Sequence, residues 1–287
     1  MPLIDVSSLH DPRLADYANV KDRQLHADFC PNPDPIAPGH AEAPFGKFMA
    51  EGELVVQHLV TSRFPVISVL CTPSRYAILK PHLDRLPSVV PIYLIAPERI
   101  LELIGFSLHR GVLAIAARAP ELPLEAVTAR DAPVVICENL TNHDNVGSVF
   151  RNSAALGGQG VLLTPGCADP LYRKSVRVSV GHALHIPFAT LADFPASLSL
   201  LRARGFTIAA LHPAQGDRSF TLAAFADRCR AQNTRRIALI VGTEGPGLSP
   251  AAIDVADACI RIPMSDNVDS LNVSVATAVA LYEFSRS

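Results

Sequence analysis

The second half of the chain alternates short apolar runs with segments of helical periodicity, and this alternation restricts the fold more than any other feature of the sequence. Each apolar run is too short for a helix and predicts a buried strand; these runs are 134–137, 160–164, 206–211, 237–241 and 258–262. Helices are expected at 145–156, 170–180, 192–204, 222–230, 250–255 and 270–284. Such alternation predicts an α/β fold with a mostly parallel sheet that is covered on both faces.

A smaller alternation precedes this one and predicts a separate domain. Its expected strands are 66–71, 91–95 and 111–117, and its expected helices are 50–60, 76–83 and 98–104. Residues 1–45 are expected to be an irregular lead-in, because the fifteen residues from Cys30 include five prolines. A second proline-bearing stretch, 119–132, predicts a linker. We therefore expect a small N-terminal α/β domain at 1–118 and a larger domain at 133–287.

Composition excludes several classes of protein. A chain of 287 residues, 49% hydrophobic and 18% charged, has enough apolar material for two folded cores. Its net charge of −2 excludes a broadly basic nucleic-acid coat but not a local basic groove. Six scattered cysteines without a C-x-x-C pair, and a lone H-x-x-H at His182 and His185, favour neither a disulfide scaffold nor a metal site. With no secretory leader and no membrane-length apolar run, the expectation is a cytoplasmic protein without metal or membrane contact.

Three polar, glycine-bearing segments follow expected strands, at 138–157, 241–249 and 262–276. In open α/β sheets ligands bind beyond the carboxyl ends of the strands, so these segments are the candidate site. Each taken alone is equally compatible with turn and helix-cap chemistry. None contains a Walker phosphate loop, a dinucleotide fingerprint or a G-x-S-x-G nucleophile elbow.

Together, the three segments resemble the signature motifs of the SpoU (TrmH) family of RNA 2′-O-ribose methyltransferases, part of the SPOUT superfamily. The matching positions are Asn145, Gly147 and Arg151 in the first motif, Gly242, Glu244, Gly245, Gly247 and Leu248 in the second, and Ile262–Met264 with Ser270–Ala276 in the third. Two positions depart from the family pattern. Asp266-Asn267 replaces the usual glycine pair, and Thr243 replaces the common Asn or Ser.

The resemblance implies a C-terminal SPOUT domain with a parallel sheet and a trefoil knot, preceded by a small α/β substrate-binding domain. It also implies S-adenosylmethionine as the cofactor, held largely by backbone groups. The cofactor-binding residues that it carries over are Gly242, Thr243, Ile262, Ser270 and Leu271. The catalytic residues that it carries over are Arg151, Asn145, Glu244, Ser270 and Asn272.

The implied reaction is methylation of a ribose 2′-hydroxyl in structured RNA, either ribosomal or transfer RNA. A sugar hydroxyl is a poor nucleophile at neutral pH and must be polarised. We expect Arg151 to orient the ribose-phosphate and to stabilise the developing alkoxide. Glu244 is expected to hold Arg151 or Asn145, while Ser270 and Asn272 complete the polar wall.

RNA contacts are expected outside the three motifs. Arg173 and Arg177 lie at i, i+4 spacing on one expected helix with Lys174, which suits phosphate contacts or an ordinary solvated face. His109 and Arg110, near the end of the N-terminal domain, are further RNA-binding candidates. The N-terminal domain resembles small ribosomal RNA-binding proteins. The last helix is apolar on nearly all sides, so it must be buried, either within the domain or in the homodimer that the resemblance implies.

Two other classes of protein remain as alternatives. A non-catalytic RNA-binding or assembly protein that retains the fold would not need Asn145, Arg151, Glu244 and Asn272 together. A Rossmann-type dehydrogenase would need the fingerprint that this chain lacks.

Overall fold

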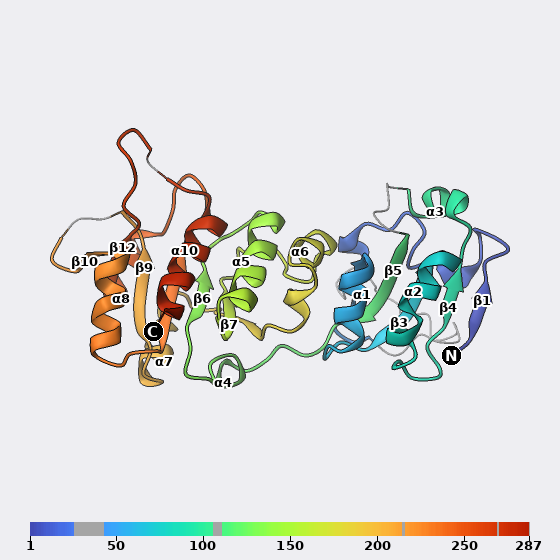
Figure 1. Ribbon diagram of the computed structural model, residues 1–287, viewed down its shortest axis with the longest axis horizontal. Helices are drawn as coiled ribbons and strands as arrows, with labels where there is room; N and C mark the ends of the chain where they lie inside the picture. Colours follow the sequence, from blue (N-terminus) through green and yellow to red (C-terminus); the bar gives the residue numbers. More distant parts are fainter. Residues whose placement is uncertain (26–42, 106–110, 214–215, 269, 287) are drawn as a thin grey trace. The chain divides into compact units, whose positions relative to one another are not determined.

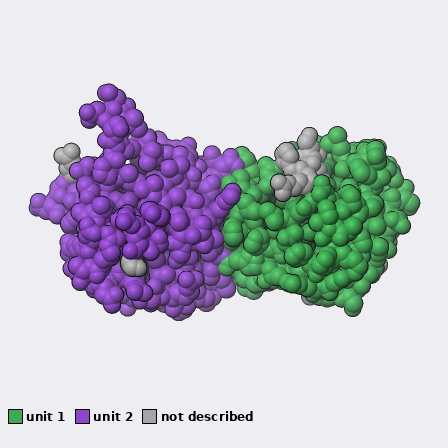
Figure 2. Space-filling view, viewed as in Figure 1, with its two compact units in different colours: residues 1–120, 171–185 green, residues 121–170, 186–287 purple. Residues whose placement is uncertain are grey.

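The chain forms two compact units, each with its own sheet (Figures 1 and 2). The computed structural model describes residues 1–25, 43–105, 111–213, 216–268 and 270–286. Unit 1 consists of residues 1–120 and 171–185, and unit 2 consists of residues 121–170 and 186–287. His109 and Arg110 lie outside the described residues.

Unit 1 is built on a five-stranded sheet in the order β1-β4-β3-β5-β2, with β5 antiparallel to both of its neighbours. The strands are β1 Leu3–Asp5, β2 Lys47–Glu51, β3 Val66–Cys71, β4 Ile92–Leu94 and β5 Val112–Ala117. The helices are α1 Glu53–Val60, α2 Pro73–Leu83, α3 Pro97–Ile104 and α6 Arg173–Val178, with 3-10 turns at Pro12–Leu14, Asp22–Leu25 and His182–Leu184. The three strands predicted in this part of the chain are therefore present.

The first part of the N-terminal lead-in, residues 1–25, packs in the core of unit 1. Leu3–Asp5 forms a parallel edge strand on β4, and Leu14 and Tyr17 are fully buried in the core of unit 1. The Tyr17 hydroxyl lies 2.7 Å from the Ser68 hydroxyl on β3. A strand of three residues has too few positions to show a period of two, so the sequence does not reveal it.

Residues 47–51 form strand β2, whereas the sequence predicted a helix beginning at residue 50. The strand ends at Gly52, which has a φ of 101° and ψ of 154°, a conformation open essentially to glycine alone. Helix α1 begins directly after this glycine. The pattern of polar and apolar residues does not change between β2 and α1. Only the backbone conformation of Gly52 separates the strand from the helix.

Residues 171–185, expected to belong to the C-terminal domain, pack with unit 1 instead. Glu51 on β2 is only 1% exposed and lies 3.2 Å from the Arg177 guanidinium on α6. The backbone N–H of Arg173 donates to Asp22 at 2.7 Å. A buried carboxylate requires a partner of opposite charge, and α6 supplies it.

Unit 2 is a seven-stranded, wholly parallel sheet in the order β10-β12-β9-β11-β6-β7-β8. The strands are β6 Val134–Cys137, β7 Gly160–Leu163, β8 Phe188–Thr190, β9 Thr207–Leu211, β10 Ser219–Thr221, β11 Ile237–Val241 and β12 Ala258–Arg261. The helices are α4 Leu124–Val127, α5 His143–Ala155, α7 Leu198–Ala203, α8 Leu222–Ala231, α9 Pro250–Val255 and α10 Val273–Ser285. The predicted parallel sheet is confirmed.

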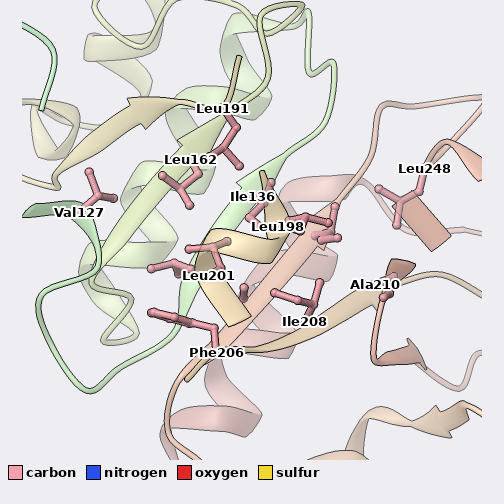
Figure 3. Close-up of a cluster of buried hydrophobic side chains, with 14 of the residues drawn as sticks. Val127, Ile136, Leu162, Leu191, Leu198, Leu201, Phe206, Ile208, Ala210 and Leu248 are labelled. Carbon is pink, nitrogen blue, oxygen red and sulfur yellow. The ribbon is translucent and has the colours of Figure 1, made fainter. Parts of the chain in front are cut away.

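One face of this sheet carries a continuous apolar core (Figure 3). Ile136, Ile208 and Ala210 of the strands lie in the same buried cluster as Leu198 and Leu201 of α7. Because side chains alternate along a strand, the intervening residues face the opposite side, where α5 contacts β6 and β7. Both faces are therefore buried, as a parallel sheet requires.

The expected linker at 119–132 is part of unit 2 for most of its length. It contains α4, and Val127 of this helix is fully buried in the core of Figure 3. The expected helix at 192–204 begins only at Leu198, and the short strands β8 and β10 were not predicted. Each of these two strands has only three residues, which is too short to show a period of two.

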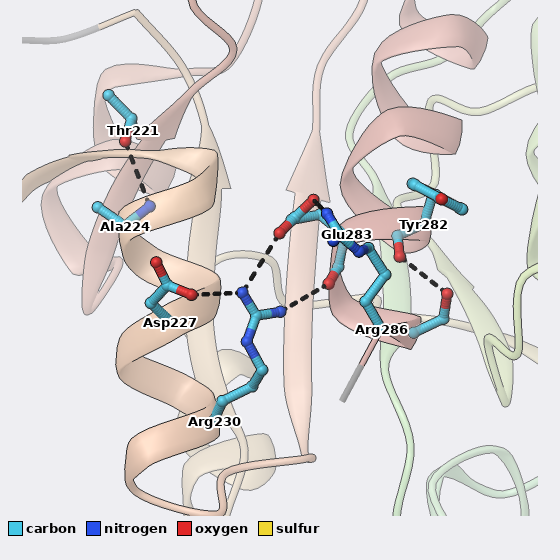
Figure 4. A network of polar contacts seen from close by, with 8 residues as sticks. Thr221, Ala224, Asp227, Arg230, Tyr282, Glu283 and Arg286 are labelled. Atoms are coloured by element: carbon cyan, nitrogen blue, oxygen red, sulfur yellow. Dashed lines mark hydrogen bonds and ion pairs between the residues drawn. The ribbon is translucent and has the colours of Figure 1, made fainter.

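Helix α10 packs on α5 and α8 and is tied to α8 by charge (Figure 4). The Arg230 guanidinium of α8 lies 2.5 Å from Asp227 and 3.3 Å from Glu283 of α10. The helix begins at Val273 rather than at residue 270. No helix in the described part of the chain meets the length and hydropathy of a membrane span.

A histidine cluster in unit 1 predicts pH-dependent stability. The His58 ring centroid lies 4.9 Å from that of His182 and 5.2 Å from that of His185. Burial, and then the charges of these two histidines, lower the pKa of His58 below its ordinary 6.5. Folded protein therefore binds fewer protons than unfolded protein as the pH falls below about 6.5, and unit 1 loses stability in that range.

Urea unfolding followed by tyrosine fluorescence, at intervals from about pH 7.5 to about pH 5, measures this loss. Four of the five tyrosines belong to unit 1, so the signal reports mainly on that unit. His58→Gln is expected to show a smaller decline below pH 6.5 than the wild type. The control is His10→Gln, at an exposed position outside the cluster. Equal pH dependence in wild type and His58→Gln would contradict the prediction.

Candidate active site

A cavity of about 730 Å³ lies at the carboxyl ends of β9, β11 and β12 in unit 2. Four segments form its wall: Leu211–Pro213, Val241–Leu248, Ile260–Ile262 with Met264, and Ser270–Val273 with Ala276. The second and third polar segments from the sequence therefore meet here. Gly242, Thr243, Ile262, Ser270 and Leu271, the predicted cofactor residues, all line the cavity.

The turn after β11 folds back closely on itself. The backbone N–H of Gly247 donates to the carbonyl of Thr243 at 3.1 Å. A Cβ on Gly242 would lie 2.4 Å from the carbonyl carbon of Gly247, which no side chain can tolerate. Gly245 and Gly247 have φ values of 90° and 70°. Glycine is therefore required for close approach at residue 242 and for left-handed backbone at the other two positions.

A buried carboxylate holds the far end of this turn. Glu138, at the end of β6, is 4% exposed and accepts a hydrogen bond at 3.0 Å from the backbone N–H of Ser249. Ser249 is the N-cap of α9, and its hydroxyl accepts from the backbone N–H of Ala252. Glu138 thus fixes the turn between two elements of the scaffold. Sequence reasoning assigned no role to Glu138, although its place directly after a buried strand was a signal.

Three side chains from the three motifs meet in one hydrogen-bond network, which we call the Asn-Glu-Asn triad: Asn145, Glu244 and Asn272. The Nδ2 atoms of Asn145 and Asn272 donate to Oε1 of Glu244 at 3.0 and 2.8 Å. Nδ2 of Asn272 also lies 3.1 Å from Oδ1 of Asn145. Two amide donors therefore orient the one carboxylate.

Helix geometry fixes the orientation of Asn272. Its Oδ1 accepts from the backbone N–H of Ser274 at 2.9 Å, which caps the N-terminus of α10. Because Oδ1 of Asn272 accepts this capping hydrogen bond, its Nδ2 faces Glu244. Asn145 lies in the first turns of α5 and is 6% exposed, so burial restricts its side chain as well.

Arg151 does not join the triad. It is an exposed residue of α5, and its side chain makes no hydrogen bond or ion pair with any residue that the structure describes. Of the two partners considered for Glu244, the structure shows Asn145 and not Arg151. Ser270 is exposed and lines the cavity without a hydrogen bond to a described residue.

One of the two residues that replace the expected glycine pair has a left-handed backbone. Asn267 has a φ of 75°, the left-handed conformation that glycine favours and asparagine tolerates better than most residues. The loop between β12 and α10 projects from unit 2 (Figures 1 and 2). Its residues Met264 and Val268 are 38% and 49% exposed.

The predicted RNA-binding arginines have protein partners. Arg177 pairs with the buried Glu51, and Arg173 lies 3.6 Å from Asp22. An RNA phosphate would compete with these carboxylates. Lys174, between them in sequence, is the exposed member of the group.

The sequence interpretation missed several residues of the cavity wall: His212, Pro213 and Arg261. His212 and Pro213 follow the carboxyl end of β9, and Arg261 ends β12. The rule that ligands bind at the carboxyl ends of strands, applied to every strand and not only to the glycine-rich segments, would have found them.

Comparison with known proteins agrees with this architecture. Residues 132–282 match the model of the SpoU rRNA Methylase family. An uncharacterized tRNA/rRNA methyltransferase of Mycobacterium tuberculosis is 42% identical over 286 residues, which is 99% of this chain and 92% of the relative. The AdoMet-bound rRNA methyltransferase of Sinorhizobium meliloti has a TM-score of 0.75 at 22% identity, over 99% of this chain and 98% of that one.

A second solved structure is more similar to this chain in sequence than the Sinorhizobium meliloti structure is. The SpoU methyltransferase AviRb of Streptomyces viridochromogenes, solved in complex with AdoMet, has a TM-score of 0.69 at 26% identity, over 84% of this chain and 90% of that one. The fold and the cavity define an α/β protein whose small-ligand site lies at the carboxyl edge of a parallel sheet. The match to the family model and the identity with the Mycobacterium tuberculosis relative along nearly the whole chain identify the family. The chain belongs to the SpoU family of RNA methyltransferases, in the SPOUT superfamily.

Asn272→Asp tests the Asn-Glu-Asn triad. Aspartate keeps the helix cap but replaces the amide donor with a carboxylate facing Glu244, so we expect a loss of about 1 kcal/mol in the free energy of unfolding of unit 2 at neutral pH. Adding Glu244→Gln to this variant is expected to restore most of the loss, because the repulsion is removed. Chemical denaturation of the two single variants and the double variant gives the coupling energy.

The matched control is Asn142→Asp, at the N-cap of α5, where Oδ1 accepts from the backbone N–H of Asp144 at 2.8 Å. It keeps the cap and lies outside the triad. Additive effects of Asn272→Asp and Glu244→Gln would show that the triad contacts carry no coupling.

Proposed function

We propose that this SpoU-family chain uses S-adenosylmethionine to methylate a ribose 2′-hydroxyl of structured RNA, ribosomal or transfer RNA. The observation that carries the proposal is the meeting of Asn145, Glu244 and Asn272 beside a cavity that is lined largely by residues of the loops after β9, β11 and β12. The AdoMet complex of AviRb supports the cofactor. The three motifs support the reaction type.

The cavity fits the cofactor in size and in chemistry. A volume of about 730 Å³ lies in the range typical of small-molecule sites. A Cβ on Gly242 would collide with the opposite limb of its turn, so glycine at this position lets the turn close beside the cavity. The backbone groups of Gly242, Ile262 and Leu271 would hold the adenosine part, with Thr243 and Ser270 beside them. Main-chain donors and acceptors recognise a neutral purine edge without charged side chains.

S-adenosylmethionine supplies an activated methyl group on a sulfonium when it is bound. The chain must then hold the ribose hydroxyl in line and stabilise the negative charge that develops on its oxygen. Arg151 is exposed and free of described partners, so its guanidinium is available to the ribose-phosphate. A guanidinium keeps its proton at neutral pH, so Arg151 acts as a donor and not as a base. The Asn-Glu-Asn triad, with Ser270 nearby, orients the polar wall.

Unit 1 is proposed as the substrate-binding unit. Lys174 is exposed on α6 and offers a point charge to phosphate. Arg173 and Arg177 hold α6 on unit 1 through Asp22 and Glu51, and reach RNA only by exchanging those partners. His109 and Arg110 remain proposed RNA contacts. The trefoil knot and a cytoplasmic location also remain part of the proposal.

The last helix supports a homodimer through unit 2. One side of α10 is buried on α5 and α8, but Val275, Val279 and Tyr282 are 48%, 38% and 56% exposed. Their spacing places them along one face of the helix. An apolar face of this kind favours a second copy as its cover.

The test of the function is a labelling assay. Purified protein and methyl-labelled S-adenosylmethionine are incubated with unmodified ribosomal RNA and, separately, with transfer RNA, and the RNA is then digested with alkali. A 2′-O-methyl group blocks cleavage at its own phosphodiester, so label is expected in alkali-resistant dinucleotides. Arg151→Ala is expected to lower the rate by about 10²–10³-fold with cofactor binding unchanged.

The control is Arg228→Ala, an exposed arginine of α8 away from the cavity, which should retain full activity. Label in mononucleotides would mean base methylation and would overturn the 2′-O assignment. Cofactor binding without label in either RNA would mean a different substrate. Absence of cofactor binding and of label would favour a non-catalytic RNA-binding protein with this fold.

Val279→Glu tests the homodimer. A charge placed in the exposed α10 face is expensive to bury, so we expect light scattering at micromolar concentration to change from a dimeric to a monomeric mass. The control is Val255→Glu on α9, where the valine is similarly exposed, at 37%. A monomeric wild type, or a dimer that survives Val279→Glu, would contradict this interface.

A further inference from the structure

Only two residues of the described cavity wall carry a full charge at neutral pH, Glu244 and Arg261, with His212 as a third titratable group. Glu244 is already engaged by the amides of Asn145 and Asn272. Arg261 is the last residue of β12 and is exposed. It makes no ion pair or side-chain hydrogen bond with any other residue that the structure describes.

The two charges lie on different sides of the cavity. Glu244 belongs to the turn after β11, and Arg261 ends β12, while β9 lies between these strands and is paired with both. Neighbouring strands are about 4.8 Å apart, so the strands that bear the two residues are separated by about 10 Å. The wall is therefore negative toward β11 and positive toward β12.

The cofactor of the proposed function, on which this inference rests, has a matching polarity. Its sulfonium is a cation near the reacting methyl, and its amino-acid end carries its only anionic group, a carboxylate next to an ammonium group. With the sulfonium toward Glu244, the amino-acid chain would extend across the β9 edge toward β12. We propose that Arg261 binds the carboxylate of S-adenosylmethionine and so fixes the direction in which the cofactor lies in the cavity.

Geometry and charge favour arginine for this task. A guanidinium presents a planar fork of donors that matches a carboxylate in bidentate fashion. Its position next to Ile262, whose backbone is assigned to the adenosine part, places the carboxylate site beside the nucleoside site in the same wall. Arg261 is thus a binding and orienting residue, while Glu244 and Arg151 serve the reacting end.

Two nucleoside probes separate this role from a general effect on the cavity. S-adenosylhomocysteine carries the amino-acid carboxylate, and 5′-methylthioadenosine lacks the whole amino-acid end. Calorimetric titration of both probes is made with the wild type, Arg261→Ala, Arg261→Lys and the control Arg235→Ala. Arg235 is an exposed arginine just before β11, at the opposite end of the sheet.

The expected result is a rise of about tenfold in the Kd for S-adenosylhomocysteine in Arg261→Ala, with the Kd for 5′-methylthioadenosine unchanged. Arg261→Lys is expected to lose less, because it keeps the charge but not the bidentate fork. Arg235→Ala is expected to bind both probes like the wild type. An unfolding curve of Arg261→Ala that matches the wild type excludes a folding defect.

Other outcomes overturn the assignment in distinguishable ways. Equal weakening of both probes would mean that Arg261 only shapes the cavity. Unchanged binding of both probes with weakened RNA binding would assign Arg261 to a phosphate. A wild type that binds neither probe would refute the proposed cofactor itself, and this assignment with it, whereas loss of carboxylate selectivity alone leaves the proposed function intact.

Discussion

The parallel sheet of unit 2 is the constraint on which the rest of that unit depends. Because all seven strands run in the same direction, every segment that follows a strand emerges at the same edge. Both faces of the sheet are filled by helices and apolar side chains, so this edge is where polar groups can gather without being buried unpaired. The cavity and the Asn-Glu-Asn triad both lie at this edge. The core of Figure 3 is the scaffold that keeps it in place.

A second constraint acts in unit 1. The chain leaves unit 2 after Pro170 and returns to it at Ile186, and the segment between folds with the N-terminal residues. Burial of Glu51 at 1% exposure demands a cation, and Arg177 provides it. Arg173 and Arg177, which the sequence suggested as phosphate ligands, instead pair with the carboxylates of Asp22 and Glu51 in the same unit. Charge and spacing alone do not distinguish these two uses of arginine.

Much of the fold followed from the sequence, and the exceptions share a cause. The strands 66–71, 134–137 and 237–241 have the predicted bounds, because each is a run of adequate length that is apolar apart from Ser68 in the first. The three-residue strands β1, β8 and β10 and the strand that precedes Gly52 were missed, because none of them shows a recognisable period of two. In the site, all five expected cofactor residues line one cavity, whereas the Glu244–Arg151 contact was one of two alternatives and the structure shows the other, Asn145. The cavity-wall residue Arg261 was overlooked, because no glycine-rich pattern marks it.

The sequence by itself determined the class of fold and the family motifs, because these depend on local periodicity and on residue types at fixed spacing. Only the tertiary structure decided which polar groups meet. Asn145 lies 99 residues from Glu244 and 127 residues from Asn272, yet their side chains are within hydrogen-bond distance. Periodicity reports that a residue is buried or exposed, but not against which partner. That choice is made by strand order and helix packing, which bring distant segments of the chain to one edge of the sheet.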